Sequence, residues 1–299
     1  MLITFFNRPD SLRKVLQASA HRTDLEFYLA SDGARGEQDN LDIEACWSVA
    51  EEVLGKRIHY QFLQRASNLG CKMAMKGNLD WFFDQVQYGI ILEDDCVPSD
   101  DFFNKVSSSL YSFRDNRDLI SISGSDHVPE ALITGKELFR LSMFPMVWGW
   151  GSWKPKWEKY TVEIPDVHEI TKKAANEIFG LSNTIDKFLF REVIGYRFRE
   201  VNLGKIDTWD YSLTATAWRH SMKTLQINGN LVVNVGFGEK ATHTSGAKPD
   251  WVVNKYSQVN SKSGLVKNYE GSLDRWLARN TFSSTFGEYL KNQVKRVIQ

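Results

Sequence analysis

Apolar and polar positions alternate along the first third of the chain in a pattern typical of strands followed by helices. Residues 2–6 form a short apolar run, and Leu12 and Val15 then recur at helical spacing behind Asp10 or Ser11, either of which is placed to cap the helix. The alternation continues, with strands predicted at 26–30, 58–63 and 89–92 and helices at 41–54 and from residue 70 to 82.

The pattern beyond residue 103 is more mixed. Asn228 and Gly229 interrupt the apolar segment 225–235, and this pair predicts a hairpin. The segment 146–153 is too rich in glycine for a helix. The other predicted elements are a helix at 99–113 capped by Ser99, a strand at 119–123, a helix at 184–200, a helix opening near Asp207 and a packing helix at 289–299.

This order of elements predicts an α/β fold, with a mixed, mostly parallel sheet flanked by helices and a C-terminal helical extension. In open sheets of this kind, ligands bind beyond the carboxyl ends of the strands. Asn7 and Arg8, Asp32, and the acidic residues from Glu93 to Asp95 each follow a predicted strand. We therefore expect the fold to gather these side chains at one edge of the sheet.

The composition is that of an ordinary globular protein. Of the 299 residues, 42% are hydrophobic and 25% are charged, so the chain can bury a large core. The 37 basic residues balance the 37 acidic ones, so no net field attracts nucleic acid, and we expect no nucleic-acid partner. The three cysteines lie far apart without a CxxC pair, which argues against a disulfide framework and favours a cytoplasmic location.

The sequence contains no run that approaches the roughly 18 apolar residues of a membrane span. The segment 289–299 sets Leu290 and Val294 against Lys291 and Lys295. We expect this segment to be a packing helix. Its basic amphipathic pattern leaves a peripheral contact with the inner face of a membrane as the alternative.

Three consecutive carboxylates, Glu93, Asp94 and Asp95, follow the apolar run at 89–92. Adjacent charges at the end of a buried strand are unfavourable unless a positive group meets them. Carboxylate oxygens suit Mg²⁺ or Mn²⁺, which take only one or two protein ligands when a diphosphate supplies others. The alternative is a solvated turn whose acidic residues stabilise the N-terminus of the next helix. This alternative explains Asp100 and Asp101 better than it explains the triplet.

Four motifs in order, FFNRP at 5–9, SDG at 31–33, NLG at 68–70 and ILEDDCVPSDDFF at 91–103, resemble the nucleotide-sugar half of GT-A glycosyltransferases. They are most similar to the inverting branch that carries EDD in place of DxD, which includes the N-acetylglucosaminyltransferases of N-glycan synthesis. The later segments WGWGSW, DTWDYS and GFGEKATHT resemble bacterial nucleotide-diphospho-sugar transferases. The motifs together span about residues 2 to 244.

The resemblance implies a division of the chain. Residues 1–115 would be the nucleotide-sugar-binding half of one GT-A domain, and residues 116–245 its acceptor-binding and catalytic half. Residues 246–299 would form a C-terminal extension. In the first half, the resemblance also implies that Asn7, Asn68 and Gly70 line the nucleotide-sugar site.

The family pattern gives each acidic residue of the triplet its own role. It implies that Asp95 binds the metal, that Glu93 faces the ribose and that Asp94 faces the donor sugar. Asp32 would read the base, and Arg8 would approach the nucleotide. The residues alone also allow a plainer role for Arg8, as a turn residue paired with Asp10.

An inverting transfer needs a base that takes the proton from the acceptor hydroxyl. Asp207 and Asp210 are the candidates, although both also suit the start of a helix. The resemblance favours Asp210, with Asp207 and Glu239 in reserve. His243 is a candidate fourth ligand for the metal, since imidazole suits Mn²⁺, or else a polar surface residue.

An aromatic segment at Trp148, Gly149 and Trp150 is a candidate wall beside the donor sugar or the acceptor, because a ring face stacks on the apolar face of a pyranose. Packing against the sheet is the alternative. The function expected from these features is metal-dependent transfer of a sugar, from a UDP-sugar by preference, to a hydroxyl of a glycan or glycolipid, as in bacterial surface polysaccharide synthesis. A nucleotidyltransferase and a catalytically silent sugar-nucleotide-binding protein are the alternatives.

Overall fold

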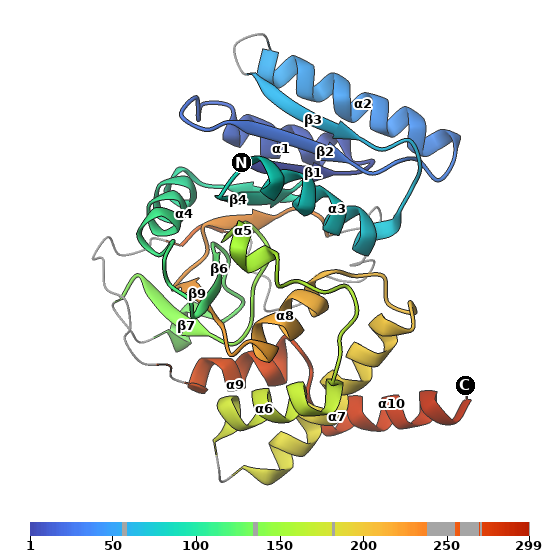
Figure 1. Cartoon of the computed structure of the whole chain (residues 1–299), viewed down its shortest axis with the longest axis vertical. Helices are drawn as coiled ribbons and strands as arrows, with labels where there is room; N and C mark the ends of the chain where they lie inside the picture. Colours follow the sequence, from blue (N-terminus) through green and yellow to red (C-terminus); the bar gives the residue numbers. More distant parts are fainter. Residues whose placement is uncertain are drawn as a thin grey trace.

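The computed structural model describes residues 1–55, 59–133, 137–180, 183–237, 255–257, 269 and 271–298. Within these residues an eight-stranded sheet has the strand order β3-β2-β1-β4-β8-β6-β9-β7, and a two-stranded sheet pairs β10 with β5. Helices cover both faces of the large sheet (Figure 1). The α/β class and the mixed, mostly parallel sheet predicted from the sequence are confirmed.

The first four strands of the chain lie parallel to one another at one side of the sheet. Thr4 of β1 lies opposite Glu93 of β4, and Phe5 of β1 lies opposite Ser31 of β2, so the three strands end together. This alignment brings the segments that follow them to one edge. The elements here are β1 (Leu2–Phe5), α1 (Pro9–Ser19), β2 (Phe27–Ser31), α2 (Glu37–Leu54), β3 (Tyr60–Gln64), α3 (Gly70–Gln85) and β4 (Tyr88–Glu93).

Strands β6 to β9 extend the same sheet, so strands from residues 1–115 and 116–245 share it. β8 (Trp150–Trp153) lies antiparallel between β4 and β6 (Leu119–Ser123). The other elements are β5 (Cys96–Pro98), α4 (Asp100–Ser112), a 3-10 turn at Glu130–Leu132, β7 (Phe139–Ser142), α5 (Lys154–Trp157), α6 (Val167–Phe179), α7 (Thr184–Asn202), α8 (Asp210–Arg219), β9 (Lys223–Ile227), β10 (Val232–Asn234), α9 (Gly271–Asn280) and α10 (Phe286–Ile298).

Two hydrophobic cores lie on opposite faces of the large sheet. Side chains alternate across a strand, so Leu2 of β1 belongs to one core and Ile3 to the other. The Ile3 core is covered by α1, α2 and α4, and the Leu2 core by α3 and by α5 to α9. Figure 1 shows α6 to α9 in the lower part of the molecule.

Several element boundaries differ from the predictions. Helix α1 begins at Pro9, and neither Asp10 nor Ser11 caps it, because proline at the first position already suits the helix start. Helix α8 begins at Asp210 instead of near Asp207. The predicted cap of α4 is confirmed, since the hydroxyl of Ser99 accepts a hydrogen bond from the backbone N–H of Phe102.

The predicted hairpin around Gly229 is wrong. β9 pairs with β6 and β7, whereas β10 leaves the large sheet and pairs antiparallel with β5. The turn between them redirects the chain from one sheet to the other. It thereby carries Asn234, at the end of β10, toward the segment that follows β4.

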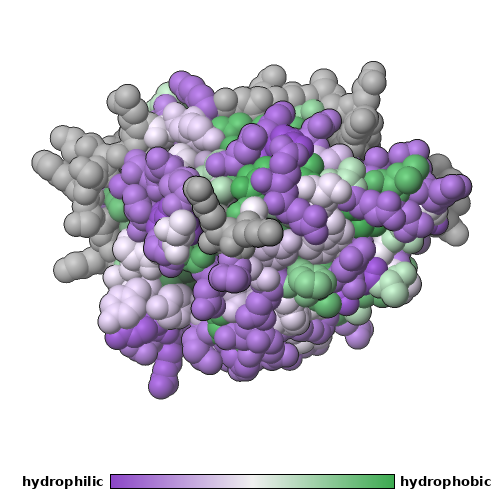
Figure 2. All heavy atoms as spheres, turned by 90° about the horizontal axis from the view of Figure 1, so that it is seen from above, coloured by the Kyte–Doolittle hydropathy of each residue, from purple (hydrophilic) through white to green (hydrophobic). Residues whose placement is uncertain are grey.

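The edge strand β3 and the neighbouring helix α2 form one end of the molecule. Phe62 of β3 and Leu41 of α2 are exposed there. Seen from this end, hydrophilic residues cover most of the surface, and hydrophobic residues gather only in separate groups (Figure 2). Such scattered apolar side chains are normal for a solvated surface. Across the described residues, no helix combines the length and the hydropathy that crossing a membrane requires.

A buried carboxylate joins α9 to the sheet, and its loss should destabilise the fold. Asp274 is 1% exposed and accepts hydrogen bonds from the Ser142 hydroxyl at 2.7 Å, the Met143 N–H at 2.6 Å and the Tyr269 hydroxyl at 2.8 Å. We expect Asp274→Ala to lower the free energy of unfolding by about 3 kcal/mol, because two buried donors and one partly buried donor lose their acceptor. Urea denaturation measures this change.

The matched control for this substitution is Asp24→Ala. Asp24 pairs with Arg22 at 2.7 Å on the exposed surface, so its removal should cost less than about 1 kcal/mol. Equal losses for the two variants would show that α9 is not attached through Asp274.

Candidate functional site

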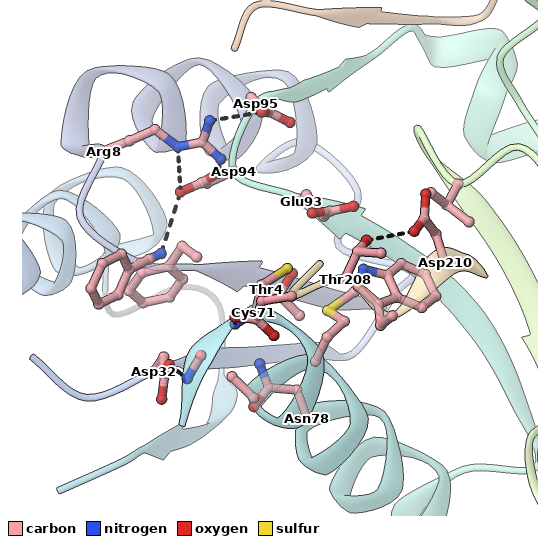
Figure 3. A pocket seen from close by; sticks show the side chains of 18 of the residues that line it. Thr4, Arg8, Asp32, Cys71, Asn78, Glu93, Asp94, Asp95, Thr208 and Asp210 are labelled. Atoms are coloured by element: carbon pink, nitrogen blue, oxygen red, sulfur yellow. Dashed lines mark hydrogen bonds and ion pairs between the residues drawn. The ribbon is translucent and has the colours of Figure 1, made fainter. Parts of the chain in front are cut away.

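A cavity of about 370 Å³ opens beyond the carboxyl ends of β1, β2 and β4, where the topology was expected to gather polar side chains. Figure 3 shows carboxylates from several segments directed into it. Ten of the residues predicted for the site line the cavity, together with neighbours from α3 and β10. These ten are Arg8, Asp32, Asn68, Gly70, Glu93, Asp94, Asp95, Trp148, Asp207 and Asp210.

The start of α3 forms one wall of the cavity. The first N–H groups of a helix have no partner within the helix. Asp32, at the end of β2, accepts hydrogen bonds from the N–H groups of Leu69 and Gly70 at 3.0 to 3.1 Å. Asp207 accepts the next two, from Cys71 at 2.8 Å and Lys72 at 3.0 Å. Two carboxylates from distant segments thus satisfy four consecutive donors.

The glycines of the SDG and NLG motifs are needed for this arrangement. Gly70 has a φ of +78°, and a Cβ there would lie 2.7 Å from the Asp207 carboxylate. A Cβ on Gly33 would lie 2.3 Å from the carbonyl carbon of Ser67. Both positions therefore exclude larger residues. The Asn68 amide adds a further bond to Asp32, at 2.9 Å, so the Asp32 carboxylate is fully engaged and its predicted contact with a base stays a prediction.

Arg8 lies between two of the three consecutive acids. Its guanidinium makes a close ion pair with Asp94 through Nη2 and donates to Asp95 from Nη1 at 2.8 Å. The carboxylate of Asp94 is 2% exposed and also accepts from the Phe6 N–H at 3.3 Å. Burial raises the pKa of Asp94, and the charge of Arg8 opposes that rise. Asp94 is thus directed toward Arg8 and the loop after β1 (Figure 3).

Arg8 does not have the alternative role of a turn residue paired with Asp10, since its partners are Asp94 and Asp95. These two negative charges raise the pKa of Arg8 against the effect of its burial, so the guanidinium stays charged. Arg8 is therefore a fixed positive charge on the cavity wall. A guanidinium in such a position suits a phosphate or carboxylate ligand.

Asp95 is held from a second side by the small sheet. Its Oδ1 accepts from the Asn234 amide at 3.3 Å and from the Cys96 thiol at 3.3 Å, while its Oδ2 receives the bond from Arg8. The backbone carbonyl of Asp95 accepts from the Val235 N–H at 2.8 Å. The pairing of β10 with β5 therefore fixes the position of the Asp95 carboxylate in the cavity.

Glu93 is the least compensated acid of the three. Its carboxyl makes no hydrogen bond with any part of the chain that the structure describes. Burial is the main reason that its pKa rises to about 8, and the charges of Asp95 and Asp94 raise it further. The carboxyl is therefore largely protonated at neutral pH, and a positive ligand would favour its ionised form.

Asp210 approaches the cavity from the opposite wall. Its Oδ1 accepts hydrogen bonds from the Thr208 hydroxyl and from the Tyr211 N–H at 2.8 Å. Its Oδ2 has no hydrogen-bond partner among the described residues. Asp210 is close enough to contribute to the raised pKa of Glu93, and the two carboxyls lie near each other in Figure 3. One oxygen of Asp210 is thus fixed while the other is available.

Only part of the predicted aromatic wall lines the cavity. The Trp148 ring does so, and it contacts the rings of His127 at 4.5 Å and Phe237 at 5.7 Å between centroids. Trp150 is fully buried in the core and stacks on Trp209 with a centroid distance of 5.5 Å. The carbonyl of Gly149 accepts from the N–H of Gly124. Trp150 and Gly149 therefore pack against the sheet, which was the alternative to a place in the aromatic wall.

Of the three remaining predicted residues, the structure describes only Asn7, which does not line the cavity. Asn7 donates from its amide to Asp39 at 2.8 Å and so belongs to the loop after β1. Glu239 and His243 lie outside the described residues. Their predicted roles as reserve base and metal ligand stay predictions.

The acids fit a metal ion only in a limited way. Across the described ranges, no group of three or more histidine, cysteine, aspartate or glutamate residues could by itself hold a metal. Asp95 and the unpartnered Glu93 are nevertheless hard oxygen donors in an open cavity. This set suits Mg²⁺ or Mn²⁺ when a diphosphate and water provide the other ligands.

Several lining residues were missed at the sequence level. Thr208 donates a hydrogen bond to Asp210, and Asn234 donates one to Asp95. Neither residue was predicted, because neither follows a predicted strand of the parallel sheet. Arg35 and Asn78 also line the cavity. The DTWD spacing was a usable signal for Thr208, whereas Asn234 enters the site only because β10 pairs with β5.

Comparison with known proteins identifies no family for this chain, since no protein-family model matches it and the search of curated proteins returns no match either.

The raised pKa of Glu93 should appear in the pH dependence of stability. In the unfolded chain the carboxyl ionises near its ordinary pKa of 4.5, and in the folded protein near 8. Between these values the folded state holds the extra proton, so its contribution to stability is lost as the pH rises through 8. The parent protein should lose stability as the pH rises from about 5 to about 8, whereas Glu93→Gln should not. The free energy of unfolding of Glu93→Gln should therefore rise relative to that of the parent by on the order of a few kcal/mol across this range.

Chemical denaturation at several pH values measures this difference. Glu44→Gln is the matched control, because Glu44 is exposed on α2 and the same change removes a carboxyl already in water. Curves for Glu93→Gln and the parent that stay parallel across the range would mean that Glu93 is ionised in the folded protein and that this description of the site is wrong.

Proposed function

We propose that this protein is a metal-dependent, inverting glycosyltransferase that uses a nucleotide diphosphate sugar. The observation that carries the proposal is the grouping of Glu93 and Asp95 with Arg8 on one side of a single cavity and of Asp210 on the other. The ordered sequence motifs support the same reading. The position of the cavity beyond parallel strands is where open α/β sheets bind nucleotides.

Asp95 and Glu93 would hold the cation on the donor side. A bound Mn²⁺ or Mg²⁺ would stabilise the negative charge that develops on the departing nucleoside diphosphate. Arg8 is already fixed by Asp94 and Asp95, so it can contact the diphosphate without a large loss of side-chain freedom. Asp94 would act through Arg8 instead of touching the donor sugar, because its carboxylate is buried against the guanidinium.

Asp210 would be the base. Its free Oδ2 would accept the proton of an acceptor hydroxyl while that oxygen forms a bond to the anomeric carbon and the bond from this carbon to the diphosphate breaks. Thr208 would keep the carboxylate oriented during the transfer. Asp207 suits this role less, since both of its oxygens already accept N–H groups of α3.

The acceptor would be a glycan or glycolipid hydroxyl, and the ring of Trp148 would provide an apolar surface for a pyranose. A UDP-sugar is the favoured donor, and synthesis of a bacterial surface polysaccharide is the favoured setting. Both preferences rest on the likeness of the motifs to the GT-A family.

Binding of nucleotides and metal is the first test. We expect UDP to raise the melting temperature more with Mn²⁺ than without, since a ligand at roughly 100 times its Kd stabilises by about 2.7 kcal/mol. Asp95→Ala should remove the metal-dependent part of the shift and leave the metal-free shift. Stabilisation by nucleoside triphosphates with release of pyrophosphate would favour a nucleotidyltransferase instead, and the absence of any shift would contradict both readings.

The identity of the base is the second test. We expect Asp210→Asn to lower kcat for sugar transfer by about 10² to 10⁴, because the amide cannot take the proton. Asp207→Asn is the control, because it makes the same chemical change three positions away. It should lower the free energy of unfolding by about 1 kcal/mol, since the cap of α3 is weakened, and should lower kcat far less than Asp210→Asn does. Transfer assays with radiolabelled UDP-sugars measure both. Equal loss in the two variants would refute the assignment, and binding without transfer in the parent protein would favour a silent binding protein.

A further inference from the structure

Helix α10 presents its apolar side to solvent, which differs from the predicted packing helix. Asn292 is 3% exposed and lies on the side that packs toward α7. Leu290 and Val294, which the pattern was expected to bury, are 48% and 58% exposed. An amphipathic helix on a globular protein normally buries its apolar side. Helix α10 instead buries the side that carries Asn292 and exposes the side that carries Leu290 and Val294.

The exposed apolar side of α10 continues onto the first turns of α7. The ring of Phe188 contacts Tyr289 with a centroid distance of 5.4 Å, and Tyr289 in turn contacts Phe286 at 6.2 Å. We call the resulting surface the apolar strip. Its members are apolar side chains that are roughly half to three-quarters exposed, namely Ile185, Phe188, Phe286, Leu290 and Val294.

The charges around the apolar strip are mainly positive. Lys291 and Lys295 are exposed on α10, beside Leu290 and Val294. The only acid of α10, Glu288, lies within 3.6 Å of Lys291 and 3.8 Å of Arg197.

The nearby acids of α7 are also paired. Glu192 faces Arg296 at 3.5 Å, and Asp186 makes an ion pair with Arg279. Each of these negative charges is thus compensated by a neighbouring cation. Lys295 has no acidic partner among the described residues. Lys291 is 73% exposed and shares Glu288 with Arg197, so the surroundings of the apolar strip keep a net positive charge for an outside partner.

We infer that the apolar strip binds the surface of an anionic lipid bilayer, with α10 lying in the plane of the interface. Apolar side chains flanked by lysines are what such a surface recognises, because the chains enter the headgroup region and the lysines meet lipid phosphates. A helix of 13 residues is about 20 Å long, so it fits this orientation. The inference is independent of the chemistry proposed for the cavity.

Co-sedimentation with vesicles tests the inference. The full chain should sediment with phosphatidylcholine vesicles that contain phosphatidylglycerol and stay largely in solution with phosphatidylcholine alone. Added salt should weaken the binding, because the lysine contribution is screened. Failure to bind the anionic vesicles at low salt would overturn the inference.

Substitutions locate the contact. We expect Leu290→Ser combined with Val294→Ser to weaken vesicle binding by about tenfold or more, since binding scales with the buried apolar area. Lys291→Glu combined with Lys295→Glu should have a comparable effect only on anionic vesicles. Because these side chains are exposed, circular dichroism and the melting temperature should not change.

The matched control is Leu41→Ser, which removes a leucine that is 55% exposed on α2, at the end of the molecule shown in Figure 2. It should bind vesicles as the parent protein does. Equal weakening by this control would overturn the inference. Sedimentation velocity tests the remaining possibility, that the apolar strip binds a second copy of the chain. That reading would replace the inference if the parent protein self-associates, the strip variants are monomeric and neither binds vesicles.

Discussion

The N-terminus of α3 is the constraint on which the arrangement of the cavity depends. Four consecutive N–H groups there need acceptors, and their partial positive charge points toward the cavity. Asp32 and Asp207 satisfy them from the end of β2 and from the segment before α8. A short helix start thus holds together two segments that are 175 positions apart, from 32 to 207, and the position of Asp210 follows from this connection.

A second constraint divides the three consecutive acids. A buried run of like charges is unfavourable, and Arg8 compensates two of its members unequally. Asp94 becomes a buried support for the guanidinium, and Asp95 is shared between Arg8 and Asn234. Glu93 has a raised pKa because it is buried beside the other two acids, and the charge of Arg8 offsets this rise only in part. The electrostatic problem visible in the sequence is therefore solved only in part by the protein. The charge of Asp95, and the ionised form that Glu93 would adopt beside a cation, are what make a cationic ligand favourable.

Local patterns predicted much of the fold and the edge at which the site forms. The alternation of apolar runs with helical spacing located β1, β2 and β4, and the alignment of their ends followed from parallel pairing. What failed depends on contacts between distant segments. Asn228-Gly229 is a strong local hairpin signal, yet Val232 pairs with Pro98 across the small sheet. Similarly, Asp207 suits a cap of its own helix, but α3 provides the donors that it accepts.

The glycines of the SDG and NLG motifs show how a motif can have a structural and a functional meaning together. Gly33 and Gly70 leave room for Ser67 and Asp207, so their first effect is to permit the capping of α3. Both residues flank Asp32, whose carboxylate is fully occupied by that capping. A ligand in the cavity therefore meets a rigid wall of backbone and not a free carboxylate. Recognition in the cavity has to use side chains that take no part in this cap, such as Arg8, Arg35 and Asn78.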